Sequence, residues 1–261
     1  MPVTAIIYMR SLTSGKTPRS IHALMHSFLF HQIAKVSPEW SAKIHDTGEM
    51  LPFSISPIMG IQGSEIIENQ SLSLRIAILH DLFENILIET MEKGLWKEPF
   101  RLEKNLFQVE EIVVGKQNNN LWSGRESYEE LNEISSVKKS ITIEIATPLA
   151  FKRSDLHYPL PEVSLFFKNI LHRWNLCCPY ILPEETEHIH IGYSYINIQT
   201  IPYSLRKGGS IVGCIGRLTF ILKASEAERK LYHKLLRFAF YSGVGVKTAQ
   251  GMGMIRITKA E

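Results

Sequence analysis

The sequence has few cysteines and no long apolar run. Its three cysteines are Cys177, Cys178 and Cys214, an odd number with two adjacent, which fits neither a disulfide framework nor a zinc-binding pattern. No apolar stretch reaches the roughly 18 residues of a membrane span, and the N-terminus lacks the basic and apolar regions of a secretory signal. We therefore expect a reduced, cytoplasmic setting and no membrane partner.

Basic residues are only slightly more numerous than acidic ones, 29 against 26. The formal net charge is +3, with a pI near 8.7, which permits an anionic partner without requiring one. The apolar fraction of 44% and the charged fraction of 21% are those of a globular protein. A chain of 261 residues can form one large domain or two of ordinary size.

Apolar periodicity in the first 114 residues predicts the order β-α-β-β-α-β, with a short extra helix after the first. Val3 to Met9 is β-branched and apolar, as in a strand, and Ser20 can cap a helix that runs to about Lys35. Pro38 favours a short second helix that ends near His45. The other predicted elements are strands at 51–58, 72–78 and 106–114 and a helix at 81–91.

A polar stretch at 115–138 is typical of a linker or exposed loop, and the same element order returns after it. The predicted strands lie at 141–146, 188–198, 211–222 and 252–258, and the helices at 161–176 and 225–241. We therefore predict an α+β fold of two tandem ferredoxin-like (RRM-like, βαββαβ) domains, at 1–138 and 139–261.

A glycine-rich segment separates the last helix from the last strand. Two Gly-apolar-Gly steps, Gly243-Val244-Gly245 and Gly251-Met252-Gly253, flank a polar stretch that contains Lys247. Glycine accepts positive φ and close approach of a backbone or a phosphate. A dinucleotide fingerprint would need a strand before the glycines and a helix after them, and a Walker loop would need an earlier glycine where Arg10 stands. The alternative is that this glycine-rich segment only connects the helix to the strand and binds no ligand.

This glycine segment, in a tandem ferredoxin-like chain, resembles the CRISPR-associated repeat-cleaving endoribonucleases, the Cas6 family of the RAMP superfamily. The resemblance extends over nearly the whole chain. It includes Pro38 to Asp46, Pro52 to Pro57, Leu74 to Phe83, Thr147 to Phe151 and Gly213 to Phe220. It implies an endoribonuclease that cleaves CRISPR repeat precursor RNA.

In that family cleavage is independent of metal, so the resemblance implies no cofactor and no metal site. The 2′-OH attacks the adjacent phosphorus and leaves 2′,3′-cyclic phosphate and 5′-OH ends. Histidine suits the acid and base roles because its pKa lies near working pH. The resemblance places His45 at the histidine that ends the short second helix, with His31 as its partner.

Several departures from the family pattern leave alternatives open. Phe30 stands where many members have a tyrosine on the first helix, and phenylalanine cannot transfer a proton. His22 and His26, on another face of that helix, could substitute for His31 or form a core-edge stripe; two histidines at this spacing could also hold zinc, although no third ligand is evident. Residues 46–51 lack the lysine that some members have, so either Lys35, Lys43 or Lys247 supplies the charge or the enzyme relies on two histidines.

Basic residues and glycines supply the predicted RNA contacts, with solvated surface charge as the alternative for each basic residue. These predicted RNA-binding residues are Gly243, Gly245, Lys247, Gly251, Gly253, Lys152, Arg153, Arg206 and Lys207. The implied partner is CRISPR repeat RNA, as precursor and as mature crRNA. Other subunits of a CRISPR effector complex and a second copy of the chain are further candidate partners.

Two further functions compete with the endoribonuclease. The first is a catalytically silent RAMP-type subunit that binds RNA within a CRISPR effector complex, which Phe30 and the missing lysine keep open. The second is a tandem ferredoxin-like protein with another ligand.

Overall fold

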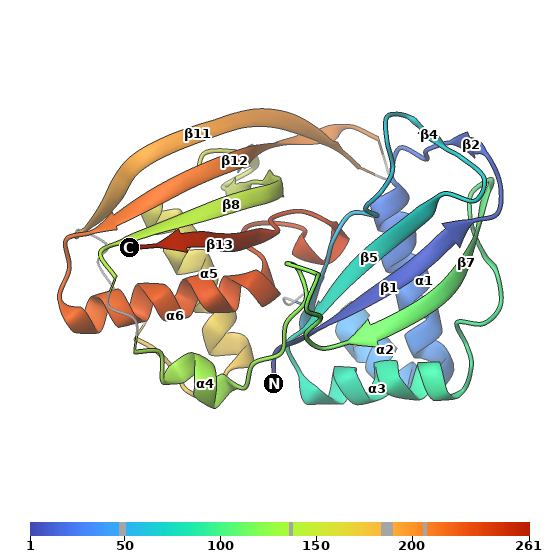
Figure 1. Ribbon diagram of the computed structural model, residues 1–261, viewed down its shortest axis with the longest axis horizontal. Helices are drawn as coiled ribbons and strands as arrows, with labels where there is room; N and C mark the ends of the chain where they lie inside the picture. The colour runs from blue at the N-terminus through green and yellow to red at the C-terminus, as the bar shows by residue number, and fades with distance from the viewer. Residues whose placement is uncertain (47–50, 136–137, 184–189, 206–207) are drawn as a thin grey trace.

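The computed structural model describes residues 1–46, 51–135, 138–183, 190–205 and 208–261, with only the backbone described at 43–46. Two sheets lie side by side, each with its helices on one face, and the chain crosses from one sheet to the other once (Figure 1). None of the helices in these ranges is long and apolar enough to cross a membrane.

The N-terminal sheet has the strand order β3-β5-β1-β7-β6, and neighbouring strands are antiparallel. Its core is formed by aliphatic and aromatic side chains beneath α1 and α3. The elements of this half are β1 (Val3–Ser11), β2 (Gly15–Lys16), α1 (Ile21–Val36), α2 (Pro38–Asp46), β3 (Phe53–Ile55), β4 (Glu65–Ile66), β5 (Ser71–Ile78), α3 (Asp81–Glu92), β6 (Phe100–Leu102) and β7 (Asn105–Val114).

The C-terminal sheet has the order β11-β12-β8-β13, again antiparallel, and α5 and α6 cover one of its faces. In chain order the four C-terminal strands are arranged second-third-first-fourth, the ferredoxin-like topology. The N-terminal strands β3-β5-β1-β7 have the same arrangement, with β6 added at the edge beside β7, so the predicted fold class is confirmed. The elements here are α4 (Tyr128–Asn132), β8 (Ser140–Leu149), β9 (Phe151–Arg153), β10 (Leu156–Tyr158), α5 (Val163–Cys177), β11 (Ile191–Ser204), β12 (Ser210–Leu222), α6 (Glu226–Ser242), η1 (Thr248–Gln250) and β13 (Ile255–Ala260).

The segment at 115–138 is more ordered than its polar composition predicts. It contains α4, whose N-terminus has a capping box between Ser127 and Glu130. Tyr128 and Leu131 are buried in the core of the C-terminal half because they lie one helical turn apart on the same face. The reading of the whole segment as a linker or exposed loop was therefore wrong, whereas the division at 138/139 stays a prediction.

Helix capping follows the sequence at one helix and departs from it at another. Ser225, at the start of the helix predicted at 225–241, accepts a hydrogen bond from the Glu228 amide and completes a capping box at α6. Ser20 precedes α1 as predicted, but its side chain makes no capping hydrogen bond. The start of α1 is fixed instead by packing, since Ile21 is buried in the N-terminal core.

A buried arginine joins the two halves. The Arg75 side chain on β5 donates to the carbonyl oxygens of Trp122 (2.7 Å) and Phe240 (2.7 Å), and its guanidinium lies 4.5 Å from the centre of the Phe240 ring. Burial lowers the pKa of Arg75 to about 9. The Ser54 hydroxyl on β3 also donates to the end of α6, at the Tyr241 carbonyl (2.6 Å). The N-terminal sheet therefore binds the end of the helix that leads into the glycine segment.

We expect Arg75→Met to lower the free energy of unfolding by about 2–6 kcal/mol, because it leaves two buried carbonyl groups without donors at about 1–3 kcal/mol each. Urea denaturation of the purified chain measures the loss. Arg10→Met is the matched control, since Arg10 forms an exposed ion pair with Glu110 whose removal costs at most about 1 kcal/mol. Equal losses in the two variants would contradict the interpretation.

Candidate nucleic-acid interface

The glycine segment 243–253 lies at the junction of the two halves. It leaves α6, forms the short helix η1 against α1 and β3, and enters β13 (Figure 1). A Cβ at Gly251 would lie 3.3 Å from the Pro57 nitrogen and 3.5 Å from the His22 Cβ. Ala249 is buried in the N-terminal core. The fold thus brings this segment to the helix that carries His22, more than 200 residues earlier in the sequence.

The glycines are required by the protein's own backbone. Gly243, Gly245, Gly251 and Gly253 all have positive φ and are buried. A Cβ at Gly245 would overlap the carbonyl oxygen of Ala150, and one at Gly253 would overlap that of Val244. The close approach that the sequence predicts therefore takes place within the protein, between neighbouring chain segments.

Three of the glycine amides already have acceptors. The Gly243 amide donates to the Ala239 carbonyl (2.9 Å), and the Gly253 amide to the Pro148 carbonyl (2.9 Å). The Gly245 amide donates to Oδ1 of Asn169 (2.7 Å). Since each amide has one hydrogen, these three glycines shape the segment, and a direct RNA contact through them stays a prediction.

Residues that the sequence analysis did not select fix this segment in place. Arg173 on α5 is buried and donates to the carbonyls of Ser242 (2.8 Å) and Gly245 (3.1 Å). Asn169 lies one turn earlier on the same helix and binds the Gly245 amide. Two polar residues four apart on an otherwise apolar helix face were the signal available in the sequence. The Tyr203 hydroxyl, from β11, donates to the Gln250 carbonyl.

The basic candidates differ in their surroundings. Lys247 is half-buried and has the left-handed conformation, with φ of 53°. Lys152 and Arg153 are exposed on β9, shortly after Ala150, whose carbonyl accepts a hydrogen bond from the Val246 amide of the glycine segment (2.9 Å). Arg153 forms an exposed ion pair with Glu162 (3.2 Å). Arg206 and Lys207 lie outside the described residues.

Three of the histidine candidates lie on α1, on two different faces, and the fourth lies on α2. His22, His26 and Phe30 are spaced four apart and face the protein: the His26 ring centre lies 4.7 Å from that of Phe30 and 6.2 Å from that of Phe53. His31 is exposed. His45 lies in the last turn of α2, and its side chain is outside the described residues. The structure thus brings His22, and not His31, to the glycine segment.

His22 is held in a desolvated position. Its ring stacks on Tyr203, with ring centres 5.8 Å apart, and burial lowers the pKa of His22 to about 4. The ring is therefore neutral at pH 7 and contributes packing at the junction. Within the described ranges, no three His, Cys, Asp or Glu side chains gather as a metal-ion site.

We expect the junction to weaken in acid. A histidine with a pKa of about 4 in the folded state and about 6.5 in the unfolded state gives stability that is complete above pH 6.5 and is lost as the pH falls towards 4. The loss amounts to about 3 kcal/mol at 1.36 kcal/mol per pKa unit. Unfolding free energies at pH 7 and pH 4.5 for the wild type and His22→Phe measure it. If the pH dependence of the variant matches that of the wild type, the assignment to His22 is wrong.

Comparison with known proteins gives one consistent result. The family model for the CRISPR-associated endoribonuclease Cas6 matches residues 143–255. The Cas6 endoribonuclease of Mycobacterium tuberculosis (strain CDC 1551 / Oshkosh) is 24% identical over 125 residues, which cover 46% of this chain and 39% of the relative. That of Streptococcus thermophilus is 25% identical over 121 residues, which cover 44% of this chain and 49% of the relative. The matched region therefore spans two-fifths to one-half of the curated relatives.

Solved structures match over the whole fold. A Cas6 solved as a product complex covers 98% of this chain and 100% of its own, with a TM-score of 0.75 and 26% identity. These findings support a Cas6-family protein. A second Cas6 product complex gives a TM-score of 0.84 at 23% identity, with 98% and 100% of the two chains covered. The predicted family is thereby confirmed, and the Cas6 fold includes the N-terminal half that the family model does not reach.

Proposed function

We propose that this Cas6-family chain is a metal-independent endoribonuclease that cleaves CRISPR repeat precursor RNA into guide RNAs. The observation that carries the proposal is the junction of the glycine segment with α1. Gly251 lies against His22, so the glycine segment packs on the helix that also carries His31. The Cas6 relatives support it, since those from Mycobacterium tuberculosis and Streptococcus thermophilus are endoribonucleases by name and two Cas6 structures are product complexes.

The proposed chemistry assigns proton transfer to histidines. His45 acts at the end of α2, where the helix dipole favours the imidazolium form and so an acid role. His31 is its proposed partner, and its exposure on α1 leaves it open to an RNA strand. The 2′-OH attacks the adjacent phosphorus, the bond to the 5′-oxygen breaks, and one proton is removed and one is supplied. Lys247 provides positive charge near the phosphate.

A silent RNA-binding subunit is the second candidate. Phe30 favours it, because its half-buried ring packs on Phe53 and has no proton to transfer. The absence of lysine and arginine from residues 46–51 points the same way.

The deciding experiment uses an end-labelled repeat RNA, taken from the array encoded nearest to this chain, with EDTA present. We expect one cut that leaves 2′,3′-cyclic phosphate and 5′-OH ends. Binding of that RNA without cleavage by the intact chain would favour the silent subunit. Absence of binding in a low-salt gel shift would rule out both candidates.

We expect Lys247→Ala to weaken repeat binding without abolishing cleavage at saturating protein. One phosphate contact fewer lowers the slope of log affinity against log salt by about 1. Gel-shift titrations at several salt concentrations measure that slope. Lys230→Ala is the control, because Lys230 forms an ion pair with Glu226 on α6. An unchanged slope in Lys247→Ala would remove this residue from the interface.

A further inference from the structure

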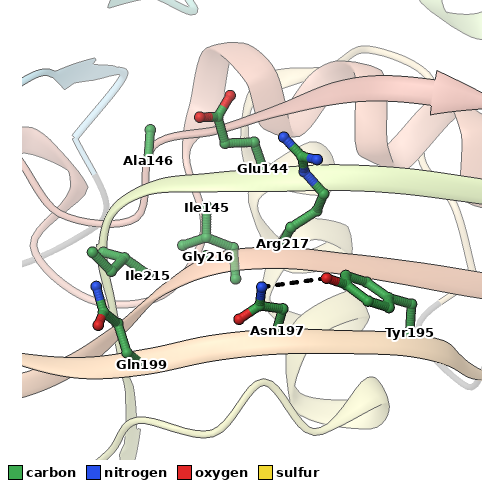
Figure 2. A pocket seen from close by; sticks show the side chains of 9 residues that line it. All are labelled: Glu144, Ile145, Ala146, Tyr195, Asn197, Gln199, Ile215, Gly216 and Arg217. Carbon is green, nitrogen blue, oxygen red and sulfur yellow. Dashed lines mark hydrogen bonds between the residues drawn. The ribbon is translucent and has the colours of Figure 1, made fainter.

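The C-terminal sheet has a second face, which its helices do not cover. Side chains alternate along β12, with Leu218 and Phe220 buried beneath the helices and Arg217 exposed on the opposite side. A pocket of about 610 Å³ lies on this open face, a volume within the usual range of ligand sites. Figure 2 shows its lining, which comes from β8, β11 and β12.

The register places polar side chains in one row across the strands. Asn197 on β11 is opposite Arg217 on β12, and Arg217 is opposite Glu144 on β8. Glu144 is in turn opposite Arg256 on β13. Residues that face each other in neighbouring strands lie close enough to act on one ligand.

This row carries an uncompensated positive charge. The Glu144 carboxylate is paired with Arg256 (2.6 Å), and the Arg256 guanidinium also lies 5.2 Å from the centre of the Trp122 ring. Arg217 has no ion-pair partner among the residues that the structure describes. Two guanidinium groups against one carboxylate leave a net charge of about +1, which is suited to one phosphodiester.

The same face offers groups that suit a nucleobase. Tyr195, Asn197 and Gln199 alternate along β11 and all three are exposed, with 48% of Tyr195 accessible. Asn197 Nδ2 donates to the Tyr195 hydroxyl (3.3 Å), which fixes the amide beside the ring (Figure 2). An exposed aromatic ring can stack on any base, and amide side chains can bind its polar edge.

A glycine lines the pocket where β11 and β12 come close. Gly216 has φ of +136° at an irregularity in the pairing of β12 with β8, and it lines the pocket between Arg217 and Ile215. A Cβ there would overlap the Asn197 carbonyl oxygen, so only glycine allows β11 to approach β12 this closely.

The pocket lies near the glycine segment along β8. Ala146 lines the pocket, and two residues further along β8 the Pro148 carbonyl accepts the Gly253 amide. Two residues of strand span about 7 Å, so one RNA strand can reach both places.

We propose that the open face of the C-terminal sheet binds an unpaired nucleotide of an RNA strand. The base stacks on the Tyr195 ring. The amides of Asn197 and Gln199 bind the polar edge of the base, and Arg217 pairs with the phosphate of the nucleotide. The inference rests on the proposed function for RNA as the ligand, but it requires no cleavage.

The test uses the full chain and a fluorescent octauridylate, with an abasic oligomer of the same length as the second probe. We expect Tyr195→Ala to weaken octauridylate binding about tenfold, the loss typical of one base–aromatic stack, and to leave abasic binding unchanged. Tyr195→Phe keeps the stack and should bind within about twofold of the wild type. Arg217→Ala should weaken both probes. Tyr180→Ala, at an exposed tyrosine outside this face, is the matched control.

Photocross-linking locates the contact independently. A 4-thiouridine oligomer should cross-link to the β11 peptide that contains Tyr195. Wild-type affinity in Tyr195→Ala, an equal loss with the abasic probe, or no octauridylate binding by the wild type would each overturn the inference. If instead the Tyr195 effect appears while the repeat RNA stays uncut, the inference holds and the proposed endoribonuclease activity fails.

Discussion

His45→Ala is expected to lower the single-turnover rate of repeat cleavage by about 10²–10⁴-fold, the usual contribution of a general acid or base. RNA affinity should change little, because the proposed phosphate contacts lie on the glycine segment and on β9. Cleavage is measured with excess protein over labelled repeat RNA, and affinity with the same RNA carrying a 2′-deoxy substitution at the cut.

Two comparisons sharpen this result. His172→Ala is the control, since His172 is exposed on α5 in the other half of the molecule. His31→Ala should slow cleavage as well, with one limb of the pH–rate profile removed if His31 is the partner of His45. Wild-type rates in both His45→Ala and His31→Ala would show that the histidine assignment is wrong even if the chain cleaves RNA.

Gly253→Ala is expected to lower the free energy of unfolding by about 2–5 kcal/mol and to abolish RNA binding in the fraction that unfolds. Positive φ costs an alanine about 1–2 kcal/mol, and overlap in a packed interior adds about 1–3 kcal/mol. Both apply here, because Gly253 has φ of +68° and a Cβ would meet the Val244 carbonyl. Chemical denaturation of the purified variant gives the value.

Gly63→Ala separates the two causes. Gly63 has a similar φ of +73°, but a Cβ there has no neighbour within 4 Å. It should therefore lose only the conformational cost of about 1–2 kcal/mol. Comparable losses at Gly63 and Gly253 would contradict the view that backbone approach within the protein selects glycine in the segment 243–253.

Much of the fold could be predicted because its signals are local. Alternation in β5 and β12, helical spacing in α3 and α5, and the capping box at Ser225 each depend on neighbours within a few residues. Helix α4 was missed because its surroundings are polar and only Tyr128 and Leu131 reveal its buried face. The short strands β9 and β10 depend on pairing with each other.

The candidate site was predictable only in part. The resemblance to the family selected His45 and His31, the glycine segment selected Lys247, and their roles stay predictions. Three residues hold the glycine segment: Asn169 and Arg173 are one turn apart on α5, whereas Tyr203 comes from β11 and has no sequence pattern in common with them. Their convergence depends on how α5 and β11 pack around that segment.

The sequence by itself indicated the family resemblance, the order of the elements and a glycine-rich segment near the C-terminus. The tertiary structure decided what those glycines approach, namely other parts of the protein at Ala150, Val244 and His22. It also decided that the open face of the second sheet joins Asn197, Arg217 and Glu144 in one row. The physical reason is range: propensity and periodicity act within a few residues, whereas backbone approach and strand register join residues tens to hundreds of positions apart.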